Sequence, residues 1–164
     1  FIDKTRVGCM GWSYGGYVSA FAGIHSDKFR AVSVGAGTSD NYNYYVTRGN
    51  PQDMAQYLSG SPFINRENYI KTAPISKIKE AKTPMLIQHG ARDQAVALSN
   101  ATELYRGLKD MNVPVELFIY PEMGHSITRP REMRTVMLQN LTWFSHHLLS
   151  EKLEFPGTRE EYKF

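Results

Sequence analysis

The chain has one cysteine, no long apolar run and little net charge. Cys9 is the only cysteine among 164 residues, so an intrachain disulfide is excluded, and we expect it to be a small buried strand residue. The longest apolar runs fall far short of the roughly 20 residues that a membrane-spanning helix needs. The net charge is +3, and no basic stripe with interleaved aromatic residues occurs, so nucleic acid is not an expected partner.

A recognisable metal-binding pattern is also lacking. The chain has five histidines, but none is spaced as in a His-Glu-x-x-His or a mixed Cys/His site. Hydrophobic residues make up 41% and charged residues 21% of the chain, which is the composition of an ordinary globular domain. At this length we expect a single domain with a sizeable core.

Short apolar segments alternate with amphipathic ones along most of the chain. Strands are predicted at residues 6–11, 31–36, 85–90 and 115–120. Helices are predicted at residues 14–25, 97–111 and 130–150. We expect the last helix to carry one apolar stripe, formed by Met133, Val136, Met137, Leu141, Phe144 and Leu148. This alternation predicts an α/β fold with parallel strands and right-handed crossovers.

Two segments depart from this rhythm. Residues 38–83 are rich in Tyr, Asn, Gly and Pro, and we expect them to form loops and short helices across one end of the sheet. An excursion of this length often supplies a lid or a pocket wall. The C-terminal tail, residues 151–164, has a weak pattern, and we expect its end to lie loosely on the surface.

A serine between glycines follows the first predicted strand, in the sequence Gly11-Trp12-Ser13-Tyr14-Gly15. A nucleophile elbow needs a strand, a sharp strained turn and a helix, with small residues flanking the serine. Gly11 and Gly15 meet that demand, and the next residue is a glycine as well. Taken alone, the motif is also compatible with an inert tight turn.

Two later residues have the types that would activate such a serine. Asp93 follows the strand at 85–90 in HGARDQAV, and His125 follows the strand at 115–120 in PEMGHS. Both lie after the carboxyl ends of predicted parallel strands, where open parallel sheets place their sites. The order serine, acid, histidine is that of α/β-hydrolases. Taken singly, Asp93 is compatible with a helix N-cap and His125 with a surface loop, while His89 is expected to be a packing residue.

The motifs together resemble a known family. They are GWSYGGY (11–17), TPMLIQHGARDQAV (83–96), ELYRGLK (103–109), VELFIYPEMGHS (115–126) and NLTWFSHHL (140–148). The chain resembles the C-terminal part of the catalytic α/β-hydrolase domain of the prolyl oligopeptidase family of serine peptidases, in its acylaminoacyl-peptidase and dipeptidyl-peptidase-like branch. The resemblance implies that residues 1–164 are a partial catalytic domain, the C-terminal half of an α/β-hydrolase that lacks the N-terminal strands.

The resemblance also implies roles for the matching residues. Ser13 would be the acylated nucleophile, His125 the general base and then acid, and Asp93 the group that orients His125. The backbone N–H of Tyr14 would stabilise the oxyanion, and the candidate substrate-binding residues are Tyr42, Tyr44, Tyr45 and Val96. The implied substrates are peptides or acyl-aminoacyl compounds, and the mechanism requires neither a metal nor an organic cofactor.

One residue that differs from the family pattern, and one missing part of the site, leave two alternative functions open. Members of the family often carry Arg or Asn at the position of Ala95, where the side chain holds a substrate carbonyl, so an esterase is one alternative. The family's loop that supplies the second oxyanion donor has no counterpart in these residues. A non-catalytic fragment or assembly module with an incomplete oxyanion hole is therefore a further alternative. The strand before Ser13 would also expose an unpaired edge, and we expect a missing N-terminal part of the same protein, or another copy of the chain, to pair there.

Overall fold

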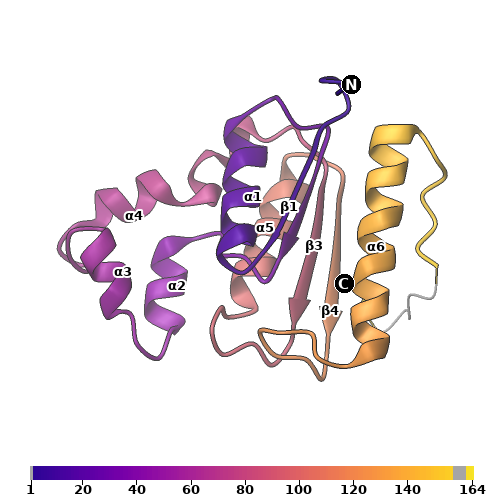
Figure 1. The fold of residues 1–164 in the computed structure, drawn as a ribbon. Helices are drawn as coiled ribbons and strands as arrows, with labels where there is room; N and C mark the ends of the chain where they lie inside the picture. The colour runs from indigo at the N-terminus through magenta and orange to yellow at the C-terminus, as the bar shows by residue number, and fades with distance from the viewer. Residues whose placement is uncertain (1, 157–161) are drawn as a thin grey trace.

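In the computed structural model, which describes residues 2–156 and 162–164, a parallel sheet separates two layers of helices (Figure 1). The strands are β1 (Gly8–Trp12), β2 (Ala31–Gly35), β3 (Met85–Gly90) and β4 (Val115–Tyr120). Their order in the sheet is β1-β2-β3-β4, and each neighbouring pair is parallel. The carboxyl ends of all four strands therefore lie at the same end of the sheet, as the sequence predicts for an α/β fold.

One face of the sheet is covered by α1 (Tyr14–His25), α5 (Ser99–Asp110) and the 3-10 helix η1 (Pro74–Glu80). The other face is covered by α6 (Pro130–Leu149), which stands on the opposite side of the strands in Figure 1. The predicted bounds of α1, β3 and β4 agree with the observed ones. Strand β1 begins and ends later than the predicted 6–11, and the ends of β2, α5 and α6 differ from prediction by one or two residues.

The core lies in two clusters, one on each face of the sheet. The cluster under α1 and α5 contains Ala20, Val34, Ile87 and Leu104, each no more than 2% exposed. Strands β2 and β3 are buried along their whole length, as is typical of parallel strands covered by helices on both faces. This burial explains why their sequences, AVSVG and MLIQHG, do not alternate between apolar and exposed polar residues.

Helix α6 forms where it is predicted, but only part of its apolar stripe packs on the sheet. Val136 and Phe144 are partly buried against the core. Met133, Met137 and Leu141 are instead 47%, 70% and 64% exposed. Half of the six stripe residues therefore do not pack on the core.

Polar side chains replace them at the interface between α6 and the sheet. The side-chain amide of Gln88 on β3 donates a hydrogen bond to Oε1 of Gln139 at 2.7 Å, and Asn140 donates to Oε1 of Gln88 at 2.9 Å. The indole of Trp143 donates to the carbonyl oxygen of Val32 at 3.0 Å. These hydrogen bonds offset most of the cost of burying polar groups, although Oδ1 of Asn140 has no partner within the described residues. A hydrophobic pattern does not reveal such a face.

The end of the tail also differs from expectation. Tyr162 is 3% exposed and its ring lies 5.1 Å from that of Tyr120. The backbone N–H of Phe164 donates to the carbonyl oxygen of Leu117 at 3.0 Å, so residues 162–164 pack beside β4. The expectation that these residues lie loosely on the surface is therefore wrong. They pack because aromatic side chains provide a large apolar area to bury. Residues 157–161 lie outside the described part of the chain.

Residues 38–83 contain short helices, as expected. They are α2 (Asn41–Thr47), α3 (Gln52–Tyr57) and α4 (Arg66–Thr72), and Figure 1 shows them grouped to one side of the sheet. That these helices form a lid or a pocket wall stays a prediction. Within the described residues, no helix is both long enough and apolar enough to cross a membrane.

Candidate active site

Ser13 occupies a sharp turn between β1 and α1. Its backbone has φ 60° and ψ −120°, a strained conformation for a residue with a side chain. The Ser13 N–H donates to the carbonyl oxygen of Gly35 at 2.8 Å, and the Tyr17 N–H donates to the carbonyl oxygen of Ser13 at 3.0 Å. Strain of this kind costs about 1–3 kcal/mol, so it persists only where the surroundings hold it. Here it presents the Ser13 side chain at the carboxyl end of β1.

Two glycines make the turn possible, and only Gly11 is one of the pair that flanks the serine in the motif. A Cβ on Gly11 would lie 2.3 Å from the carbonyl oxygen of Gly15, and a Cβ on Gly16 would lie 2.4 Å from that of Gly35. A Cβ on Gly15 would meet nothing within 4 Å. The turn therefore needs glycine at position 11, where the backbone passes itself, and at position 16, where α1 lies against the end of β2.

His125 lies in the loop between β4 and α6. The indole Nε1–H of Trp12 donates to the carbonyl oxygen of His125 at 2.7 Å, which ties this loop to the residue before Ser13. Gly90 at the end of β3 lets the loop approach, because a Cβ there would lie 2.1 Å from the carbonyl oxygen of Gly124. The loop thus contacts the ends of β1 and β3, which lie on either side of β2 in the sheet.

Asp93 lies in the turn after β3, and its carboxylate is buried. Oδ1 accepts hydrogen bonds from the N–H groups of Ala95 at 2.8 Å and Val96 at 2.9 Å. This pattern resembles a helix cap, but α5 begins only at Ser99. Burial alone would raise the pKa of Asp93, but the surrounding imidazoles and backbone amides outweigh burial and lower the pKa to about 2.

The structure brings Ser13, His125 and Asp93 into one hydrogen-bonded line. Nε2 of His125 lies 2.7 Å from Oγ of Ser13, and Nδ1 lies 2.8 Å from Oδ2 of Asp93. Because an ionised carboxylate only accepts hydrogen bonds, the proton of the neutral ring belongs on Nδ1. Nε2 then faces the Ser13 hydroxyl as an acceptor, which is the geometry needed to remove its proton.

A second imidazole beside Asp93 was missed as a polar partner by the sequence reasoning. His89 lies on β3 and is completely buried, as a packing residue would be. Its Nε2, however, lies 2.9 Å from the carbonyl oxygen of Val96 and 3.3 Å from Oδ2 of Asp93. The only signal in the sequence is that His89 and Asp93 are close together in HGARD, across the end of a strand.

The candidate tyrosines lie together on α2. The guanidinium carbon of Arg48 lies 5.1 Å from the centre of the Tyr44 ring. Burial raises the pKa of Tyr44, the charge of Arg48 lowers it and the charge of Asp93 raises it. The Ser99 hydroxyl at the start of α5 donates to Oδ1 of Asn43 on α2 at 2.8 Å, so α2 packs against the helix that follows the Asp93 turn. A substrate-binding role for Tyr42, Tyr44 and Tyr45 stays a prediction.

The remaining candidates are placed differently. Tyr14 is the first residue of α1, and its side chain is 76% exposed. Val96 is 4% exposed, and its backbone groups contact Asp93 and His89. Val96 therefore helps to hold the turn of Asp93, while its contribution to substrate binding stays a prediction, as does that of the Tyr14 amide.

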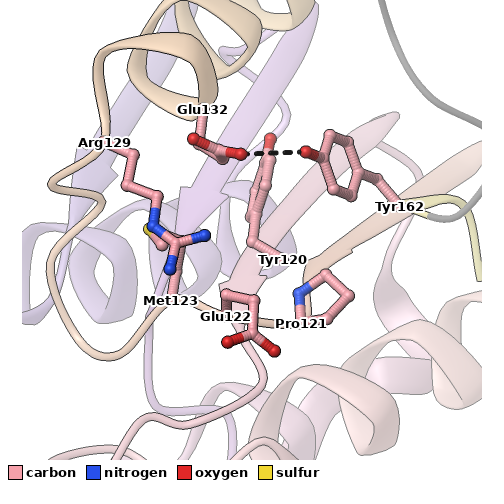
Figure 2. Close-up of a pocket in the computed structure, with 7 residues that line it drawn as sticks. All are labelled: Tyr120, Pro121, Glu122, Met123, Arg129, Glu132 and Tyr162. Carbon is pink, nitrogen blue, oxygen red and sulfur yellow. Dashed lines mark hydrogen bonds between the residues drawn. The ribbon is translucent and has the colours of Figure 1, made fainter.

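A pocket of about 290 Å³ lies where β4 leads into the His125 loop (Figure 2). Its lining residues are Tyr120, Pro121, Glu122, Met123, Arg129, Glu132 and Tyr162. Figure 2 shows the Tyr162 hydroxyl donating to Oε1 of Glu132, at 3.1 Å. Ser13, Asp93 and His125 do not line this pocket, so it is separate from the hydrogen-bonded line. The part of the chain that the structure describes holds no cluster of three or more His, Cys, Asp or Glu residues suited to a metal ion.

Known proteins are similar to this chain in sequence and in fold. The profile of the Prolyl oligopeptidase family matches residues 1–151. The chain belongs to the prolyl oligopeptidase family. The acylamino-acid-releasing enzyme of Rattus norvegicus is 28% identical over 155 residues, and dipeptidyl-peptidase 5 of Porphyromonas gingivalis is 30% identical over 139 residues. Family membership confirms the resemblance drawn from the motifs.

Solved structures of the prolyl oligopeptidase family agree in fold. The uncomplexed acylaminoacyl peptidase of Pyrococcus horikoshii superposes with a TM-score of 0.86 at 27% identity, over 93% of this chain and 26% of that one. The fold is therefore that of an α/β-hydrolase. The alignments cover 89% of this chain but 21% of the rat enzyme, and 80% of this chain but 20% of the bacterial one. The chain thus spans about a fifth of the length of these relatives.

The lowered pKa of Asp93 predicts how stability depends on pH. In the folded protein the pKa is about 2, below the ordinary value of 3.8, so ionised Asp93 stabilises the fold above pH 3.8. This contribution, about 2 kcal/mol, is lost as the pH falls from 3.8 through 2. Urea unfolding of the wild type and of Asp93→Asn between pH 2 and 7 should therefore give free energies that differ most near neutrality and converge in acid. A difference that stays constant across this range would contradict the assignment.

Proposed function

We propose that this chain carries the acid–base and nucleophilic residues of a serine peptidase that cleaves peptide or acyl-aminoacyl bonds. The observation that supports this most directly is the pair of short contacts at His125, 2.7 Å to Ser13 and 2.8 Å to Asp93. The strained Ser13 backbone supports it further, because such strain is typical of a nucleophile elbow. Relatives of this chain are named as acylamino-acid-releasing and dipeptidyl-peptidase enzymes.

In the proposed reaction, Oγ of Ser13 attacks the substrate carbonyl carbon while Nε2 of His125 takes the hydroxyl proton. The imidazolium that forms is stabilised by Oδ2 of the buried, ionised Asp93. It then gives its proton to the leaving amine, and the acyl group remains on Ser13. A water molecule, deprotonated by His125, attacks this ester; the bond to Oγ of Ser13 breaks, His125 returns the proton to Oγ, and the acid is released.

The developing oxyanion needs hydrogen-bond donors that are fixed in advance. We assign one of them to the backbone N–H of Tyr14, which directly follows the nucleophile at the start of α1. Helix N-termini favour negative charge, because their first N–H groups have no partner within the helix. In other hydrolases the loss of one such donor lowers kcat by about 10²–10³.

The aromatic residues of α2 are proposed to form part of the substrate pocket. Tyr42 and Tyr45 both pack edge-on against Phe63, with ring centres 5.9 Å and 6.4 Å apart. Phe63 is itself 73% exposed. An exposed aromatic cluster beside a site suits an apolar substrate side chain. Tyr44, on the same helix, is proposed as a further wall residue.

Ala95 favours a second candidate function, an esterase. It is exposed and lies two residues after Asp93, at the position where family members often carry Arg or Asn. Its methyl group offers no hydrogen bond to a peptide carbonyl, so substrates that need less anchoring would be accepted.

Turnover of two substrates by the protein distinguishes these functions. Hydrolysis of an N-acyl aminoacyl anilide is expected, and Ser13→Ala should reduce it by several orders of magnitude, because the acyl-enzyme cannot form. Ser126→Ala is the matched control, since Ser126 is an exposed serine beside His125, and it should retain activity. Hydrolysis of a p-nitrophenyl ester alone would indicate the esterase. A folded protein that cleaves neither substrate would overturn both functions in favour of a non-catalytic assembly module.

We also propose that the open edge of β1 pairs with a strand from another part of the same protein. Within the described residues β1 pairs only with β2. The Val7 carbonyl and the Ser13 N–H both point towards β2, so by strand alternation the N–H groups of Met10 and Trp12 point to the open edge. Exposed strand edges are normally covered or blunted, and Met10 is 60% exposed here.

Amide hydrogen exchange tests this pairing residue by residue. The amides of Met10 and Trp12 should exchange slowly, at rates comparable with those of Cys9 and Gly11, which face β2 and serve as internal controls. Protection that appears only as protein concentration rises would instead point to a second copy of the chain. Fast exchange at Met10 and Trp12 beside slow exchange at the two controls would contradict any partner at this edge.

A further inference from the structure

His89 is the one histidine that lies wholly inside the structure and contacts the candidate site. It is completely buried on β3, next to the glycine that ends the strand. Its Nε2 lies 2.9 Å from the carbonyl oxygen of Val96 and 3.3 Å from Oδ2 of Asp93. Its Nδ1 has no hydrogen-bond partner in the described part of the chain.

These contacts decide which nitrogen carries the proton. Both oxygens near Nε2 are acceptors, so Nε2 must be the donor. A proton on Nδ1 as well would leave a buried donor without a partner and a buried charge on the ring, both of which are costly. His89 is therefore a neutral ring that presents one N–H to Val96 and to Asp93.

We propose that His89 is a positioning residue for Asp93, fixing its carboxylate through the Nε2–H that it shares between Oδ2 and the carbonyl oxygen of Val96. The proposal rests on the function proposed above for Ser13 and His125. It gives the Asp93 carboxylate a second imidazole partner beside His125, and this second imidazole does not take part in proton transfer.

The need for such a residue follows from the other contacts of Asp93. Oδ1 is held by the Ala95 and Val96 amides of its own turn, so those bonds move with the turn. Oδ2 is held by His125, whose charge changes during the proposed reaction. His89 is different because it belongs to a buried strand. It anchors both Oδ2 and the turn to the sheet, and as a neutral ring it leaves the charge of Asp93 available to His125.

The contact is tested with two variants of the protein. His89→Leu keeps a similar apolar volume and removes the donor, whereas His89→Gln keeps an N–H that can reach the same oxygens. We expect His89→Leu to lower kcat by about tenfold to a hundredfold with little change in KM, because a hydrogen bond to a charged group is lost in the step that charges His125. His89→Gln should recover much of this loss. Substrate binding should be unaffected, because His89 is buried away from solvent.

A proton NMR measurement follows the same contact without catalysis. The low-field resonance of the His125 Nδ1–H that faces Asp93 should shift or broaden in His89→Leu and return in His89→Gln. A folded His89→Leu variant with unchanged kcat and an unchanged resonance would overturn the proposal. If the wild type hydrolyses no substrate, the proposed function fails, while the resonance still decides whether His89 holds Asp93.

The wild type alone provides a further test, which applies if His89→Leu does not fold. Nitrogen chemical shifts of the His89 ring should show a proton on Nε2 and none on Nδ1. A ring protonated only on Nδ1 would present no donor to Asp93 and would overturn the proposal.

Discussion

The buried carboxylate of Asp93 is the group around which the candidate site is assembled. Removing a charged carboxylate from water is costly unless hydrogen-bond donors surround it, and here backbone amides from its own turn and imidazoles from β3 and the His125 loop do so. These donors keep its pKa low, at about 2, so the carboxylate stays charged at neutral pH. A charged Asp93 in turn sets the proton of His125 on Nδ1 and leaves Nε2 to face Ser13. The charged Asp93 carboxylate therefore determines both the orientation of the His125 ring and the electrostatics of the site.

The sheet brings these groups together at the carboxyl ends of its strands. Parallel strands all end at one edge, so the segments that follow β1, β3 and β4 meet there although they are distant in sequence. Close backbone approaches complete the arrangement. Gly11 and Gly16 permit the turn at Ser13, and Gly90 lets the His125 loop reach the end of β3. The strain at Ser13 is tolerated because a rigid strand and helix hold both sides of the turn.

The sequence predicts those features that depend on local pattern. Strands β3 and β4 are short, mainly apolar segments, and their bounds agree with prediction. The residues that follow them, Asp93 and His125, come together with Ser13. Features that depend on a tertiary partner were not predicted. The buried face of α6 contains Gln139 and Asn140, which are polar but hydrogen-bonded to Gln88, and no hydrophobic periodicity reveals them. The tail packs because Tyr162 finds Tyr120, and the contact of His89 with Asp93 exists only once the turn after β3 has folded.

The central claim is that His125 activates Ser13, and the rate of covalent labelling tests it most directly. A fluorophosphonate should modify the wild type once, at Ser13, as read by mass spectrometry of the peptides. His125→Gln should slow this reaction by about 10²–10⁴, which is the usual contribution of a positioned general base. An unchanged labelling rate in His125→Gln, or a folded wild type that is not labelled at Ser13, would contradict the account.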